Sequence, residues 1–337
     1  MSTPVCATNL DPKRLETTFL KAAYPKIWLL YPVLSRTLGR VTTALCIFAG
    51  LVLIFWLAGA FQMPTPSGVV LFFVVMISYI IPVLGLILDR ANHCLDELAD
   101  LLPVPAEEIY LERRSLSWQL GVLLMGTSVG LTHVGLLFLA GNLGTVPGTP
   151  DFIVLAGTLM VWIVMTTSIY ALFETATIFK QLAVQIEIDL LMTHRLKPFG
   201  QIALAMTLSM IGAQAALPIM FIDGISLVAF IPGFIALLIP LVLLVLIPTL
   251  PVRRRIIQQK QVSLQQINAE ILATRQGELK EQAEQLQSLL NYRREIEQVS
   301  EWPLDLGVAI RLVLYLLIPP LTWVGAALIE NLVDTLL

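Results

Sequence analysis

Long apolar runs alternate with shorter polar segments along most of this chain. Seven runs approach or exceed the length that a hydrocarbon core about 30 Å thick requires of a helix. They cover residues 41–61, 68–88, 119–140, 152–172, 202–222, 227–250 and 306–328. Only four residues join the fifth run to the sixth, which predicts a tight helical turn there. We therefore expect an all-α fold, a polytopic helical membrane protein with seven transmembrane helices.

One polar segment, 253–301, is much longer than the others. It holds 15 of the 45 charged residues, eight basic and seven acidic, together with ten glutamines. Apolar residues recur at helical spacing in both halves. They are Ile257, Leu264, Ile267 and Ile271, then Leu279, Ala283, Leu286 and Leu290. Gly277 separates the halves, and the chain must then return to the membrane, so the pattern predicts an antiparallel coiled-coil hairpin.

The outward positions of this hairpin allow two interpretations. The segment is either a solvated connector or an arm that binds a partner, which is a cytosolic protein or another copy of the chain. The apolar seam serves both cases, whereas exposed glutamines are needed only for solubility in an isolated hairpin. Gln265, Gln282 and Gln285 are therefore the candidate partner face.

The chain divides into four regions on this pattern. Residues 1–40 are a cytosolic and interfacial segment, and 41–250 hold six spans with cytosolic helical extensions at 89–118 and 173–201. Residues 251–303 are the hairpin, and 304–337 are the seventh span with a short outside tail. Helical periodicity continues beyond spans two, four and six, so we expect those helices to extend past the membrane.

Basic residues decide the orientation. Under alternation, 1–40, 89–118, 173–201 and 251–305 face one side and hold all Lys and Arg except Arg311, which lies just inside the last span near that face. The opposite loops and the C-terminal tail hold none. Positive charge marks the cytoplasmic side. We therefore predict a plasma-membrane protein with its N terminus inside and its C terminus outside.

Composition supports the bilayer as the main environment. The chain is 57% hydrophobic and only 13% charged, and its mean hydropathy is +0.81, whereas soluble domains carry about 25% charged residues. Cys6, Cys46 and Cys94 have no pairing or metal spacing. The sequence shows no zinc motif, no HExxH and no phosphate-binding glycine loop. We expect no enzyme activity, no cofactor and no metal, and the charge-balanced hairpin argues against nucleic acid as a partner.

A few polar residues fall inside the predicted spans. They are His133, Thr132 and Ser128 in span three, Thr167 in span four and Gln214 in span five. Such residues either line a path for ions or make interhelical hydrogen bonds. The span interiors contain no carboxylate that could relay protons. We therefore predict packing or pore-lining roles and no coupled proton transport.

Glycines and prolines suggest where helices approach or bend. Gly126 and Gly130 form a GxxxG that allows close approach to another helix, in this chain or in another. Pro319 and Pro320 remove two backbone donors from the last span, which predicts a kink, either a passive one or the hinge of a gate. The three arginines after span six, at 253–255, suit a topology anchor, with anionic lipid as the alternative ligand.

Two functions fit these patterns. The first is a non-enzymatic membrane protein that acts in assembly or signalling through its cytosolic hairpin. The second is an oligomeric passive ion channel whose proline-kinked last helix lines the pore. The outline of seven spans with these termini is similar to that of insect chemoreceptor channels, although no motif of that family is present, and this similarity favours the second function slightly.

Overall fold

The computed structural model describes residues 39–61, 67–99, 101, 116–141, 149–221, 227–274 and 281–303, with the single positions 307, 310 and 314. Every regular element in these ranges is a helix. The prediction of an all-helical protein is therefore confirmed at the level of fold class.

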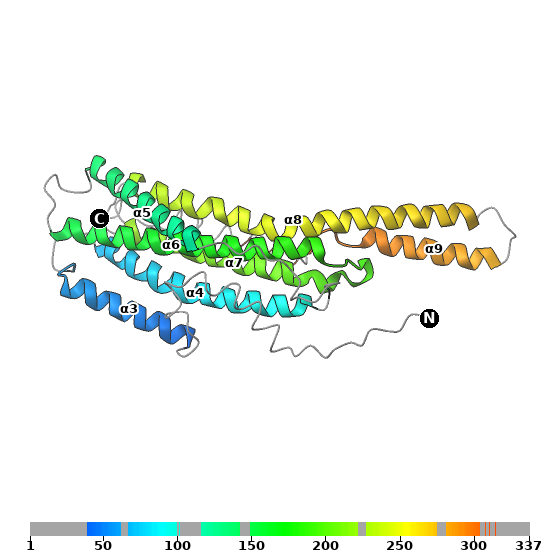
Figure 1. The fold of residues 1–337 in the computed structure, drawn as a ribbon, viewed down its shortest axis with the longest axis horizontal. Helices are drawn as coiled ribbons and strands as arrows, with labels where there is room; N and C mark the ends of the chain where they lie inside the picture. Colours follow the sequence, from blue (N-terminus) through cyan, green and yellow to red (C-terminus); the bar gives the residue numbers. More distant parts are fainter. Residues whose placement is uncertain are drawn as a thin grey trace, which may run out of the picture.

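The helices form an elongated bundle from which one hairpin projects along the long axis (Figure 1). In chain order they are α3 (Arg40–Leu57), α4 (Ser67–Ala99), α5 (Leu116–Leu139), α6 (Thr149–Gln185), the 3-10 helix η3 (Leu190–Leu196), α7 (Lys197–Ala215), the 3-10 helix η4 (Leu217–Phe221), α8 (Leu227–Thr274) and α9 (Glu281–Gln298). The C-terminal half of α8 and the whole of α9 make the projecting hairpin.

Five stretches are long and apolar enough to cross a membrane. They are Arg40–Leu57, Gly68–Ala99, Leu120–Leu139, Asp151–Gln185 and Leu190–Met220, and they match the first five predicted spans. The sixth predicted span lies in α8, where the side chains of several residues near the start are outside the described part of the chain. Nearly all of the seventh is also outside it. The membrane prediction therefore holds for five helices, and the count of seven remains a prediction.

Helix α4 lies at the centre of the bundle, and α3 lies at its edge. In their most apolar windows 67% of α4 is buried, against 17% of α3. Helix α4 packs against α3, α6 and α7, and small residues allow the closest of these approaches. Gly157 of α6 lies on the Phe73 ring, and Gly212 of α7 lies on the Tyr79 hydroxyl. The apolar residues that α3 exposes suit contact with lipid tails.

Two of the expected helical extensions are continuous with their spans, and one is shorter than predicted. Helix α4 runs on to Ala99 and α8 runs without a break to Thr274. Helix α6 ends at Gln185, whereas the periodicity had suggested a helix reaching towards Pro198. Asp189 starts a separate 3-10 helix there, because its carboxylate accepts a hydrogen bond from the Leu191 backbone N–H at 2.9 Å. Pro198 then occupies the first turn of α7, where a missing N–H costs nothing.

The hairpin is held by positions spaced three and four residues apart. The least exposed positions of its α8 arm include Ile256, Lys260, Leu264, Ile267 and Ile271, and those of α9 are Leu286, Leu289, Arg293 and Ile296. Four of these nine positions, Leu264, Ile267, Ile271 and Leu286, belong to the predicted seam, and the side chain of Ala283 is outside the described residues. The prediction is wrong at Leu290, which is 46% exposed, because the inward face of α9 runs through its neighbour Leu289.

Several predicted features lie outside the described residues. These are the segment 1–38, the turn at 222–226, Gly277 and Leu279 at the hairpin tip, and the proposed hinge at Pro319 and Pro320.

Candidate functional site: the hairpin and its junction with the bundle

His133, the most chemically active of the predicted intramembrane residues, joins two helices. Its Nδ1 atom accepts a hydrogen bond from the Trp162 indole N–H at 2.7 Å. The rings meet edge to face with centroids 5.7 Å apart, and His133 is buried. The neutral imidazole with its proton on Nε2 is the form that accepts this bond. The contact joins α5 to α6, which is the geometry that the packing interpretation expects.

The hydroxyl residues predicted beside His133 do not converge on it. Thr132 donates to the Ser128 backbone carbonyl at 2.9 Å, and Thr167 donates to the Ile163 carbonyl at 2.7 Å. Each bond lies within one helix, one turn back, so neither hydroxyl links two helices. Ser128 and Thr132 are exposed on the outer side of α5. Both suit lipid-facing positions, and the Thr132 hydroxyl is satisfied within its own helix.

Gln214 is buried in α7, and its helix packs chiefly on α8 and α4, whereas α5 packs chiefly on α6. The structure therefore gives Gln214 and His133 different helix neighbours. Among the described residues the Gln214 Nε2 atom has no hydrogen-bond partner. The same holds for the Ser168 hydroxyl, which lines a cavity of about 30 Å³ between α4, α6 and α7. This cavity has room for about two water molecules and its walls are almost wholly apolar.

The GxxxG of the third span has its partner within the same chain. A Cβ built on Gly126 would lie 3.2 Å from the Ile163 Cα, and one on Gly130 would lie 2.9 Å from a Leu159 methyl. Both glycines therefore allow α5 to approach α6 closely. Gly121 and Gly135, the other two glycines of α5, have nothing within 4 Å of a built Cβ.

Arg255 of α8 connects the hairpin arm to the end of α6. Its guanidinium donates hydrogen bonds to the backbone carbonyls of Ala183 at 3.1 Å and Val184 at 2.9 Å, and to that of Ile186. The last carbonyls of a helix have no partner within it, and they carry the negative end of the helix dipole. A planar cation with several donors satisfies both the charge and the hydrogen bonds.

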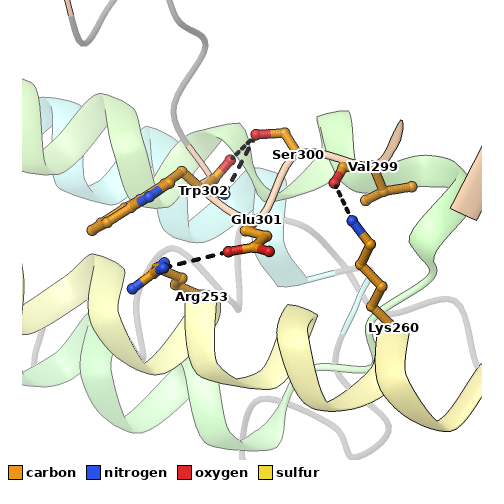
Figure 2. A network of polar contacts seen from close by, with 6 residues as sticks. All are labelled: Arg253, Lys260, Val299, Ser300, Glu301 and Trp302. Carbon is orange, nitrogen blue, oxygen red and sulfur yellow. Dashed lines mark hydrogen bonds and ion pairs between the residues drawn. The ribbon is translucent and has the colours of Figure 1, made fainter. Parts of the chain in front are cut away.

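The end of α9 is fastened to α8 in the same way (Figure 2). The Lys260 ammonium donates to the backbone carbonyls of Glu297 at 2.7 Å and Val299 at 3.2 Å. About two turns back along α8, Arg253 pairs with Glu301 at 3.3 Å and its guanidinium carbon stacks 4.7 Å from the Trp302 ring centroid. Three cations of α8 thus hold the C-terminal ends of α6 and α9 at one junction.

Only part of this junction could be predicted from the sequence. The pattern of basic residues predicted a topology anchor at the arginines 253–255. It had no signal that Arg255 reaches α6, because that contact joins residues about seventy positions apart. The contact of Lys260 could have been predicted, because a lysine in an otherwise apolar seam needs a polar partner. The carbonyls at the end of the opposite arm are that partner.

The predicted partner face lies on the outside of the hairpin. Gln265 of α8 and Gln285 of α9 are both exposed, while the side chain of Gln282 is outside the described residues. The two arms differ in character. The exposed positions of α9 include charged residues of both signs, Glu284, Arg294, Glu295 and Glu297. Those of α8 beyond Lys260 are mostly Gln, Asn and small or apolar residues.

In the described ranges, no three His, Cys, Asp or Glu side chains group so that they could hold a metal ion. At the junction, Arg255 and Lys260 donate to backbone carbonyls and Arg253 pairs with Glu301, while the Arg253 Nε atom has no hydrogen-bond partner among the described residues. No protein family, curated protein or solved structure matches the chain.

Proposed function

We propose that this chain is a non-enzymatic, multi-pass plasma-membrane protein that acts in assembly or signalling, through the hairpin 251–303 as a cytosolic coiled-coil module. The partner is a second copy or a cytosolic protein, with the lipid bilayer around the bundle. The observation that carries the proposal is the junction. A spacer needs no fixed direction, yet Arg255 joins α8 to the end of α6, and Lys260 and Arg253 hold the two arms of the hairpin together at its base.

Continuity of α8 supports the same conclusion. A helix of 48 residues is about 72 Å long at 1.5 Å per residue. It passes from the bundle into the hairpin as helix without a loop, past Pro248 and Pro251, each of which removes one backbone hydrogen bond. An arm that is joined by helix rather than by a loop can present its exposed outer face to a partner in a defined orientation. Such an arm loses less conformational entropy on binding than a flexible arm would.

The experiment replaces the surface of the hairpin and keeps its base. Residues 261–296 are exchanged for a designed antiparallel hairpin of equal length with a different outer surface, and Arg253, Arg255 and Lys260 are retained. The matched control carries the native outer residues on the same designed seam. We expect the foreign surface to leave the protein folded but to abolish its native complex on a sizing column. The control should keep the complex.

Retention of both complex size and cellular function by the foreign surface would show that the segment is only a spacer. The passive channel would then be the better proposal, and the bundle rather than the hairpin would carry the function.

A further inference from the structure

The outer face of the α8 arm has almost no charge. Its exposed positions from 258 to 273 are Gln258, Gln259, Gln261, Val262, Gln265, Gln266, Asn268, Ala269, Glu270, Leu272 and Ala273. Glu270 is the one acidic or basic residue among them. A helical surface that serves only solubility usually carries charged residues of both signs, as α9 does. The uncharged face therefore needs an explanation other than solvation.

An apolar stripe runs along this face. Val262, Gln265, Ala269 and Leu272 recur at intervals of three, four and three residues, so they lie on one side of the helix, and we call them the outer stripe. Val262 is 47% exposed and Leu272 is 63% exposed. The spacing is that of a helix–helix contact, yet α9 packs on a different side of α8, through Leu264 and Ile267.

The chemistry of the face suits an identical face. Each glutamine amide both donates and accepts hydrogen bonds, so glutamines can pair with glutamines. The outer stripe itself carries no charged residue, so it meets its own copy without charge repulsion. A strongly basic or acidic partner would find no complementary charge there. A twofold interface must be complementary to itself, and this face satisfies that condition.

The membrane restricts how two copies can meet. Chains inserted in the same orientation are related by a twofold axis along the membrane normal, and the hairpin projects along the long axis of the bundle (Figure 1). The two α8 arms would then run parallel and in register. Each residue of the outer stripe would face the same residue of the other copy.

We propose that the outer stripe of α8 is the contact between two copies of this chain, a parallel and in-register pairing of the two hairpins. This inference rests on the proposed function, and it names the partner. The contact is about 24 Å long at 1.5 Å per residue over 258–273. It covers on the order of 300 Å² per copy, well below the roughly 800 Å² of a standard interface. The pairing is therefore weak and reversible in solution, and confinement in one bilayer raises the local concentration that favours it.

The first test places a cysteine on the stripe. In a background with Cys6→Ser and Cys46→Ser, Gln265→Cys is compared with Gln285→Cys, a matched exposed glutamine on the other arm. Buried Cys94 is retained. A short bismaleimide linker is applied to native membranes and dimers are counted on a denaturing gel. We expect dimers from Gln265→Cys at least several-fold above those from Gln285→Cys, and equal yields would overturn the proposal.

The second test uses charge to separate identical from different partners. Ala269→Lys and Ala269→Glu each put like charges face to face in an in-register pair, so each variant alone should lose most of the crosslinking at position 265. Coexpression of the two variants puts opposite charges together and should restore it. Loss in both single variants without restoration in the mixture would exclude the in-register pair of copies.

The two proposals fail in different ways. If the foreign hairpin surface dissolves the native complex but Gln265→Cys gives no dimers, the partner is a different protein and only the present inference is overturned. If the foreign surface leaves the complex intact, the proposed function itself is wrong.

Discussion

A single buried hydrogen bond shows what the polar residues of the bundle do. The Trp162 indole donates to His133, and we expect Trp162→Phe to remove this bond while keeping an aromatic ring in place. Interhelical hydrogen bonds in membranes contribute about 0.5–1.5 kcal/mol, so the variant should lower the free energy of unfolding by about that amount. Thermal unfolding in detergent measures it. The control is Trp56→Phe on α3, whose indole is 53% exposed and should tolerate the change. Equal losses in both variants would contradict the role assigned to His133.

Glycine at position 157 sets the distance between α6 and α4. A Cβ there would lie 2.2 Å from the Phe73 ring, which cannot move aside without displacing its neighbours. Gly157→Ala should therefore destabilise the protein by about 1–3 kcal/mol, as overpacked cores do. Gly135→Ala, with nothing within 4 Å, should be neutral or slightly stabilising because alanine favours helix. Thermal unfolding of the two variants measures their stabilities. A neutral effect of Gly157→Ala would show that α6 and α4 can move apart without cost.

Residue type and spacing predicted which residues matter in the bundle better than they predicted the contacts of those residues. His133 and the GxxxG at Gly126 and Gly130 were identified from residue type and spacing alone. The helix that they contact, α6, could not be identified from the sequence, because a glycine stripe fits any helix that approaches it. Gly157 was missed for a related reason, since a single glycine within an apolar run has no pattern until Phe73 is known to face it.

Among the helices, the end of α6 depends on a residue of α8. Arg255→Met removes the donors to the Ala183 and Val184 carbonyls while keeping an apolar stem of similar length. Hydrogen bonds to charged groups contribute about 1.5–3 kcal/mol, so the last turn of α6 should fray. Hydrogen exchange at the amides of residues 180–186 should become at least several-fold faster. Arg254→Met, at the exposed neighbouring position, is the control and should leave exchange unchanged. Unchanged exchange in both variants would show that the junction is dispensable.

The elements themselves were largely predictable from the sequence. Apolar length located five spans, and helical spacing located both arms of the hairpin. The errors arose where tertiary contacts override local periodicity. Helix α6 stops at Gln185 because Asp189 opens a new turn, and Leu290 is exposed because a 3.6-residue repeat allows either of two neighbours to face inward.

For the molecule as a whole, the distribution of charge predicts which side of the membrane the hairpin occupies. All Lys and Arg fall in or next to the segments assigned to one face, so we expect that face to be cytoplasmic. A reporter that is active only outside the cytoplasm should be active when fused after Leu337 and silent when inserted after Gln276. A reporter that is active only in the cytoplasm should give the opposite pattern at the same two sites. Activity of the first reporter at Gln276 would reverse the orientation and remove the hairpin from the cytosol.

The mass of the complex, measured straight from its own membrane, tests whether the hairpin holds the chain in a complex with a partner. The protein is extracted with its surrounding lipid by an amphipathic polymer, and single-particle mass measurement is made before any dilution step. We expect the native particle to contain more protein than one chain of 37.2 kDa. When the hairpin carries the foreign surface, we expect the particle to contain one chain. A native particle that contains a single chain and nothing else would contradict the proposed function.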